Sequence, residues 1–183
     1  MAMVPGIGSA RLQALLEACE TPLGAISAPV ALLRAIPGIT PAAASAIATA
    51  RAEDGERILE QAERLGGRVL LPDDAEFPES LREVPEPPPV LFALGDLGLL
   101  RSPAVAIVGS RDHSGYGAEV ARRFGWEASA AGIVVVSGMA RGLDAVAHTA
   151  ALDAGGGTIG VLDRKSTRLN SSHIQKSRMP SSA

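Results

Sequence analysis

AVAIVGSRDHSGYGAEVARRFGWEASAAGIVVVSGMARGLDAVAHTAALDAGGGTIGVL, residues 104–162, is the stretch that decides the fold. It holds three short apolar runs, AVAIVGS, IVVVSG and TIGVL, separated by two segments with apolar residues at helical spacing. Gly132 stands where the first of these helices should stop. Such alternation of strand and helix is typical of an α/β protein with a parallel sheet. Because the first run is continuously apolar, we expect it to be a strand buried on both faces.

The first two predicted strands each run into a turn of small residues, GSR at 109–111 and SGMARG at 137–142. Turns of this kind leave backbone N–H groups pointing outward at the start of a helix, where they can hold an anion. Neighbouring parallel strands end at the same edge of a sheet, so we expect the two turns to lie side by side. The candidate phosphate-binding residues are Gly109, Ser110, Arg111, Ser137, Gly138, Ala140, Arg141 and Gly142.

Each turn also has a simpler explanation. GSR can be an ordinary strand-to-helix turn with a solvated arginine, and it lacks the G-x-G-x-x-G spacing of a dinucleotide site. We expect Tyr116 to support this turn rather than to stack on a base. Asp144 is expected to cap the second helix or to interact with its N-terminal dipole.

Asp144 and His148 stand four residues apart, a spacing that also suits a metal site or acid–base chemistry. No third ligand is close in sequence, and small alanines surround the pair, so we expect His148 to be a structural, hydrogen-bonded residue. GGGTIG at 155–160 precedes a strand, and we interpret it as a helix stop rather than a nucleotide loop. The sequence thus predicts no metal and no cofactor.

Composition limits the class of protein. Nearly half of the 183 residues are apolar, whereas aromatic residues make up only 3%, so surfaces for stacking bases are scarce. Cys19 is the single cysteine, which excludes a disulfide within the chain and fits a reducing compartment. No apolar run is long enough for a membrane span, and we expect a cytoplasmic protein that does not contact a membrane.

The charge is unevenly distributed along the chain. Residues 1–102 carry 8 Lys and Arg against 14 Asp and Glu, residues 103–163 carry 4 against 6, and residues 164–183 carry 5 basic residues and no acidic one. The overall net charge is −3. Bulk charge therefore does not favour nucleic-acid binding, which would have to come from a local site.

Residues 1–66 are predicted to form a small helical domain. VPGIGSARLQALLEAC (4–19) and IPGITPAAASAIATAR (36–51) each start with a Pro-Gly turn and continue with apolar residues at helical spacing. The helical pattern then runs on to the stop at Gly66-Gly67. The paired turns resemble helix-hairpin-helix elements, whose amides hold a DNA phosphate, although the second has Thr40 in place of the last glycine. Such hairpins also serve as protein-binding or purely structural units, and this block is acidic.

Residues 67–103 contain a strand-like RVLLP, a proline-rich segment and the apolar VLFAL. We interpret them as an ordered lead-in that delivers a short strand to the following sheet. Residues 163–183 have no periodicity and no aromatic residue, so we expect a disordered segment. This segment is similar to translated synthetic adapter sequence, and we expect it to be non-native; a genuine basic tail is the alternative.

Taken together, the motifs resemble the DprA (Smf) DNA-processing family. The resemblance is carried by FPESL…PPPVLFALGD (77–96), VAIVGSR…YG (105–117), SGMARGLDAVAH (137–148) and GGGTIGVL (155–162). It implies an incomplete, three-layer Rossmann-like parallel sheet in 67–162, preceded by a helix-hairpin-helix or SAM-like domain in 1–66. It also implies single-stranded DNA binding, loading of the RecA recombinase in natural transformation, a homodimer and no enzymatic activity. Arg111 matches the family's DNA-contacting arginine, and Gly138 to Gly142 match its glycine loop.

The sequence departs from the family pattern after Leu162, where the family continues with a glycine-rich segment, a further basic motif and more strands. The start also lacks the helix that normally precedes the first Pro-Gly turn. We therefore expect a fragment of a longer protein. Two other functions remain open: a nucleotide-processing enzyme of the lysine-decarboxylase-like group, whose PGGxGTxxE glutamate is missing here, and a helical docking module carried on an α/β scaffold.

Overall fold

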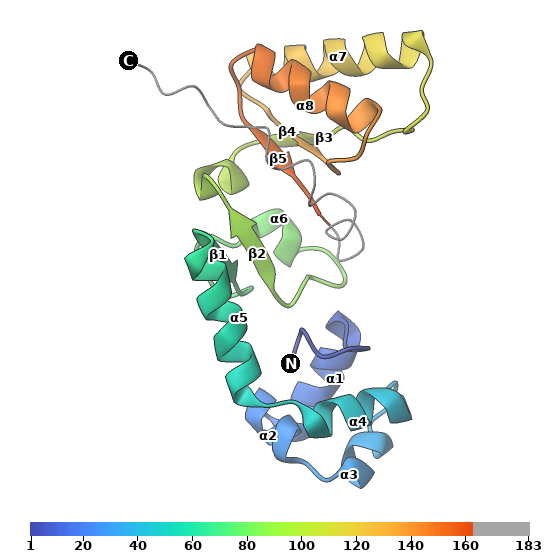
Figure 1. Cartoon of the computed structure of the whole chain (residues 1–183), viewed down its shortest axis with the longest axis vertical. Helices are drawn as coiled ribbons and strands as arrows, with labels where there is room; N and C mark the ends of the chain where they lie inside the picture. Colours follow the sequence, from blue (N-terminus) through green and yellow to red (C-terminus); the bar gives the residue numbers. More distant parts are fainter. Residues whose placement is uncertain (163–183) are drawn as a thin grey trace. The chain divides into compact units, whose positions relative to one another are not determined.

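The computed structural model describes residues 1–162, so the predictions for the segment 163–183 fall outside the described residues. The chain divides into two compact units, Met1–Arg101 and Ser102–Ala183 (Figure 1). Within residues 1–162, no helix has the length and apolar character that crossing a membrane requires.

Five helices form the first part of the first unit. They are α1 (Ser9–Cys19), α2 (Pro22–Ser27), α3 (Val30–Ala35), α4 (Pro41–Thr49) and α5 (Ala52–Arg64). α2 and α4 begin in the same way, with a threonine cap followed by proline: Thr21 Oγ1 accepts from the Gly24 amide, and Thr40 Oγ1 accepts from the Ala43 amide. α2 and α3 are too short to leave a periodic signal in the sequence.

The two Pro-Gly turns have the same backbone conformation. Gly6 and Gly38 both have φ of +82°, in the left-handed region that favours glycine. The isoleucine after each glycine, Ile7 and Ile39, is buried in one apolar core, whose fully buried members include Leu15, Leu33 and Ile47. The turns are therefore built alike, as the repeat in the sequence indicates.

The lead-in forms a small sheet of its own. β1 (Gly67–Leu70) pairs antiparallel with β2 (Leu91–Leu94), and α6 (Glu79–Arg82) and the 3-10 helix η1 (Leu97–Arg101) complete the unit. Our expectation that this segment supplies a strand to the following sheet is wrong, because β2 pairs with β1 and not with the parallel strands. Within this pair of strands only Leu70 is fully buried, and it lies opposite the partly buried Leu91.

The second unit has the predicted alternation of strand and helix. Its elements are β3 (Ala104–Ala106), α7 (Gly115–Ala130), β4 (Val134–Ser137), α8 (Leu143–Asp153) and β5 (Thr158–Gly160). The three strands are parallel in the order β3-β4-β5, with Val105 opposite Val135 and Val136 opposite Ile159. Gly132 (φ +77°) and Gly155 (φ +78°) follow the ends of α7 and α8, which confirms both predicted helix stops. The parallel α/β fold is confirmed.

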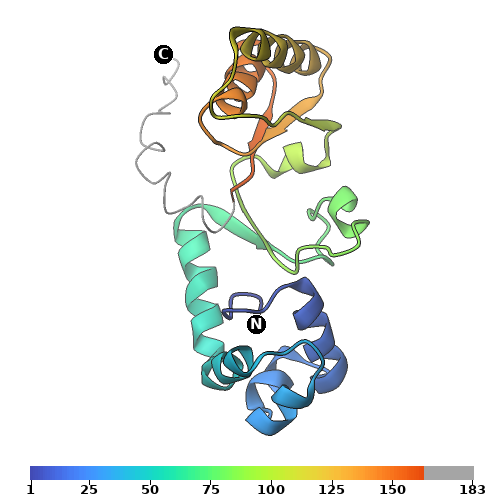
Figure 2. The same cartoon turned by 90° about the vertical axis from the view of Figure 1, so that its right-hand side faces the viewer.

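Both helices lie on the same face of this sheet and pack against each other (Figures 1 and 2). Their close approach depends on Gly125, where an added Cβ would lie 2.9 Å from the Ala147 carbonyl oxygen. Val135, in the central strand, is fully buried beneath them. The residues of β3 are all exposed, so the expectation that this strand is buried on both faces is wrong. In residues 102–162 it is an edge strand of a sheet that carries helices on one face only.

Candidate functional site

The two glycine turns follow neighbouring parallel strands and meet at the carboxyl edge of the sheet. The Leu143 amide, at the start of α8, donates to the Ser110 carbonyl oxygen at 3.2 Å. One step earlier, the Ile107 amide donates to the Val136 carbonyl at 3.0 Å, which extends the strand pairing up to the turns. The residues predicted to share a site are thus brought together, as the order of the strands requires.

Glycine is needed in this junction for packing between the turns. Gly142 has φ of +95°, and a Cβ there would lie 2.4 Å from the Ser110 carbonyl oxygen and 2.6 Å from the Cα of Arg111. A Cβ on Gly109 would lie 2.4 Å from Cδ1 of Leu143. These two glycines therefore let one turn approach the other.

The buried carboxylate of Asp144 links the two turns by hydrogen bonds. It is only 5% exposed, and its two carboxylate oxygens accept from the Gly109 amide and the Ala140 amide, each at 3.3 Å. Of the two roles expected for Asp144, a side-chain cap of α8 is not observed, whereas its place in the first turn of that helix fits an interaction with the helix dipole. Two of the amides predicted to hold phosphate are consequently bound to a carboxylate of the protein itself.

The two serines of the site brace the backbone. Ser137 is 2% exposed, and its hydroxyl donates to the Ile107 carbonyl oxygen at 2.6 Å, which joins the ends of β3 and β4. The Ser110 hydroxyl donates to the Asp112 carbonyl oxygen at 2.6 Å, inside its own turn. Both hydroxyl protons are therefore donated within the protein. Ser137 contributes to the site by holding the backbone of its turn in place.

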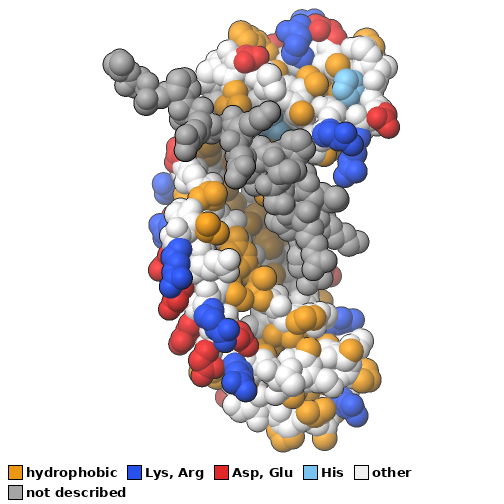
Figure 3. Space-filling model, viewed as in Figure 1, with side chains coloured by type: hydrophobic (Ala, Val, Ile, Leu, Met, Phe, Trp, Pro, Cys, Tyr) orange, Lys and Arg blue, Asp and Glu red, His pale blue; other side chains and the backbone are white. Residues whose placement is uncertain are grey.

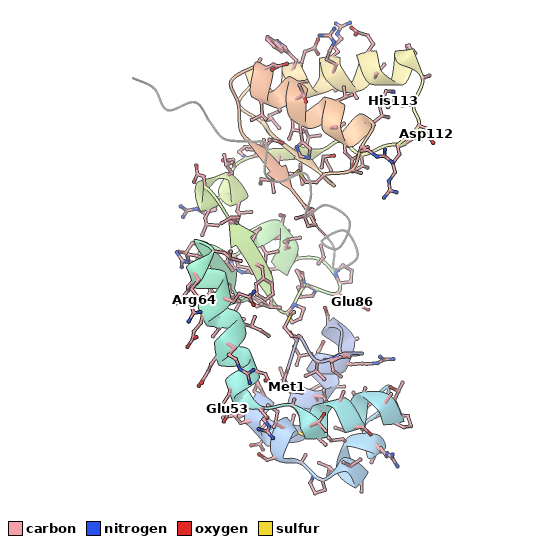
Figure 4. All side chains as sticks on the ribbon, viewed as in Figure 1. Met1, Glu53, Arg64, Glu86, Asp112 and His113 are labelled. Atoms are coloured by element: carbon pink, nitrogen blue, oxygen red, sulfur yellow. The ribbon has the colours of Figure 1, made fainter. Side chains whose placement is uncertain are left out.

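The positive charge of the site comes from Arg111 and Arg141. Both side chains are exposed, and neither forms an ion pair with any residue in the range 1–162. Arg111 comes directly before Asp112 and His113, which Figure 4 labels on the loop that leads into α7. A cationic side chain thus stands at each turn.

The two other arginines of residues 102–162, Arg122 and Arg123, are both in ion pairs. On the outer surface of α7, Arg122 pairs with Glu119 and Arg123 pairs with Glu127. The hydrogen bond from Arg122 lowers the pKa of Glu119, and the same two pairs raise the pKa of both arginines. Basic and acidic side chains also alternate along α5 in the first unit, as Figure 3 shows. Such neutralised charges make poor anion sites.

Two residues that shape the site escaped the sequence analysis. Ser114 caps α7 by accepting the Gly117 amide at 3.1 Å, and the side chain of Leu143 fills the junction between Gly109 and the first turn of α7. A serine three residues before Gly117 at the start of a helical pattern is a signal that could have identified the cap. The expectation that Tyr116 supports this turn is wrong, since its side chain is 81% exposed.

His148 is hydrogen-bonded, as predicted. Its Nδ1 lies 2.7 Å from the Thr158 hydroxyl oxygen, and that hydroxyl donates to the Val135 carbonyl, so Nδ1 carries the proton of the pair. Burial lowers the pKa of His148, and the opposing effect of Asp144 is smaller. Among residues 1–162, no three His, Cys, Asp or Glu side chains are grouped as a metal site would require.

Comparisons with known proteins cover most of the chain. The family model described as DNA recombination-mediator protein A matches residues 68–178. Protein Smf of Synechocystis sp. is 39% identical over 110 residues, which are 58% of this chain and 28% of that protein. DNA processing protein DprA of Streptococcus pneumoniae is 44% identical over 88 residues, which are 47% of this chain and 30% of that protein.

The X-ray structure of DNA processing protein A from Streptococcus pneumoniae is similar to this one, with a TM-score of 0.67 and 26% sequence identity. The alignment covers 92% of this chain and 60% of that one. The sequence matches cover less than a third of the length of the two curated relatives above, so the chain spans only part of them. The family match also runs past Leu162 into the segment 163–183, whose expected non-native origin stays a prediction. With more than half of its residues matched to the family model, the chain belongs to the DNA recombination-mediator protein A (DprA/Smf) family.

Proposed function

We propose that this chain is part of a recombination mediator that binds single-stranded DNA through its two glycine turns. The observation that carries the proposal is the pair of exposed arginines, Arg111 and Arg141, on two turns that are fastened together at the edge of the sheet. Membership of a family of DNA-processing proteins supplies the class of ligand. Guanidinium groups suit phosphate because they present several donors in one plane.

The proposed contacts differ in kind along the two turns. Arg111 and Arg141 pair with successive phosphates, and the N-termini of α7 and α8 add a favourable dipole. Three of the candidate residues act indirectly. The amides of Gly109 and Ala140 donate to Asp144, and the Ser137 hydroxyl donates to the Ile107 carbonyl oxygen. Gly138 and Gly142 shape the second turn, and the Ser110 hydroxyl oxygen still has acceptor capacity only, so we assign Ser110 to shaping as well.

We further propose that the chain binds DNA rather than catalysing a reaction on it. Three polar side chains at or near the turns are engaged within the protein: the Ser110 and Ser137 hydroxyls donate to carbonyls, and Nδ1 of His148 bonds to Thr158. Loading of RecA and assembly into a homodimer belong to the same proposal for the whole protein. They rest on the family resemblance.

Replacing Arg111 by alanine is expected to weaken binding of a fluorescently labelled oligothymidylate about tenfold, as the loss of a charge-assisted bond worth about 1.5 kcal/mol implies. The slope of log K against log salt should become shallower by about 0.7, because one phosphate fewer is neutralised. Fluorescence anisotropy at several salt concentrations measures both quantities.

Arg123→Ala is the matched control, because it also removes one exposed arginine of the same unit, but one that is paired with Glu127 on α7. It should leave the affinity within about twofold and change the salt slope little. Equal losses for the two variants would mean that only net charge matters, and the turns would then not be the binding site.

A further inference from the structure

Tyr116 is the most exposed aromatic side chain of the site's surroundings. It is the second residue of α7, its side chain is 81% exposed, and its hydroxyl bonds to no residue of the range 1–162. The chain has only one tyrosine and one tryptophan. An aromatic ring left in water at this position has no evident part in the packing of the unit.

The turn before α7 is held without the help of this ring. Ser114 caps the helix through the Gly117 amide, and Gly117 lies against the Leu143 side chain, where an added Cβ would be 3.9 Å from both Leu143 methyl carbons. Tyr116 therefore belongs to the helical turn that meets α8, but its exposure shows that it takes little part in that contact. Its exposure calls for a partner outside the packed unit.

Its location ties it to the proposed DNA site. Tyr116 follows Arg111 by five residues, on the loop and first helical turn that lead out of the first glycine turn. The other exposed aromatic residues of α7, Phe124 (61%) and Trp126 (45%), lie eight and ten residues further along the chain. At 1.5 Å per residue they are about 12–15 Å farther along the helix axis. Among these exposed aromatic residues of α7, Tyr116 is the one nearest in sequence to Arg111.

We propose that Tyr116 is a stacking platform for an unpaired base, and that it makes the site prefer single-stranded to duplex DNA. This inference rests on the proposed function. In a duplex each base face is covered by its neighbours, whereas a single strand can offer a free face to an aromatic ring. The arginines hold phosphates that both forms of DNA share, so they cannot by themselves discriminate between the two. The ring is already exposed, and it can stack without any rearrangement of the unit.

The test compares Tyr116→Leu with Tyr116→Phe in the 183-residue chain, using two labelled oligonucleotides of equal length. One is oligothymidylate, and the other carries abasic residues on the same sugar-phosphate backbone. Tyr116→Leu should weaken oligothymidylate binding by at least about fivefold, whereas Tyr116→Phe, which keeps the π-face, should stay within about twofold of the original. Binding of the abasic oligonucleotide and of a duplex should not change. Phe124→Leu is the matched control and should not change binding to any of the probes.

Fluorescence gives a direct readout of stacking. An oligonucleotide containing 2-aminopurine should lose fluorescence when it binds the original chain, and Tyr116→Leu should abolish that quenching. Equal weakening of oligothymidylate and abasic binding by Tyr116→Leu would overturn the stacking proposal. Unchanged binding of oligothymidylate by Tyr116→Leu would also overturn the stacking proposal. In either case, an affinity for the abasic probe that depends on Arg111 would still support the proposed function. A chain that binds neither probe would refute both.

Discussion

Gly142→Ala is expected to lower the free energy of unfolding of the second unit by roughly 2–4 kcal/mol, the sum of backbone strain and one lost hydrogen bond. The backbone of Gly142 has φ of +95° and ψ of −136°, a conformation that a residue with a Cβ adopts only at a cost. The added Cβ would also lie 2.4 Å from the Ser110 carbonyl oxygen, so the turns would separate and the bond from the Leu143 amide would break.

The measurement is thermal unfolding followed by tryptophan fluorescence. Trp126 is the single tryptophan of the chain and lies on α7, so its signal reports on the second unit alone. For a unit of this size each kcal/mol lowers the midpoint by about 4–8 °C. Separating the turns should also reduce affinity for oligothymidylate.

Gly132→Ala separates strain from crowding. Gly132 also has a positive φ, +77°, but nothing lies within 4 Å of its Cβ position, so only the cost of a left-handed residue, about 1–2 kcal/mol, is expected. If the two variants lost the same stability, the contact between the turns would contribute nothing, and the junction would be looser than its geometry indicates.

The fold of the second unit was predictable because its signals are local. Each strand is an apolar run, each helix ends at a glycine with positive φ, and parallel pairing follows from their alternation. The pairing of β2 was not predictable in this way. Residues 91–94 form a strand as expected, but whether a strand pairs with β1 or with the next sheet depends on contacts between distant segments. No local pattern records that choice.

For the candidate site too, the sequence predicted the local elements but not the contacts between distant residues. The sequence placed GSR and SGMARG at one edge of a sheet, and the structure brings them into direct contact. What the sequence could not show is how the donors are used. Asp144 looks like a helix cap from its position, yet it binds the amides of Gly109 and Ala140. Its partners are distant in sequence or belong to the preceding turn, so only the three-dimensional structure shows that part of the expected phosphate cradle is already filled.

Asp144→Ala is expected to lower the free energy of unfolding of the second unit, because it removes the acceptor of two partly buried hydrogen bonds, from the Gly109 and Ala140 amides. Each lost bond contributes about 0.5–1.5 kcal/mol, and thermal unfolding monitored at Trp126 should show the loss. Gly138 offers a check on the mechanism, since a Cβ there would lie 2.9 Å from Oδ2 of Asp144. Gly138→Ala should therefore cost more in the original chain than in the Asp144→Ala background, with a coupling of about 0.5–3 kcal/mol. Additive losses would mean that Gly138 and Asp144 do not constrain each other.

Asp144→Asn distinguishes the two ways in which this carboxylate can affect DNA binding. As a negative charge near bound phosphates it opposes binding, and its neutralisation should raise affinity. As the group that holds both turns in register it favours binding, and an asparagine, with one acceptor and one donor end, can satisfy only one of the two amides. The carboxylate is buried and bonded at both oxygens, so we expect the second effect to prevail. A loosening worth about 1 kcal/mol would weaken oligothymidylate binding about fivefold. Tighter binding by Asp144→Asn would show instead that the turns keep their arrangement without the carboxylate and that Asp144 acts on DNA only through its charge.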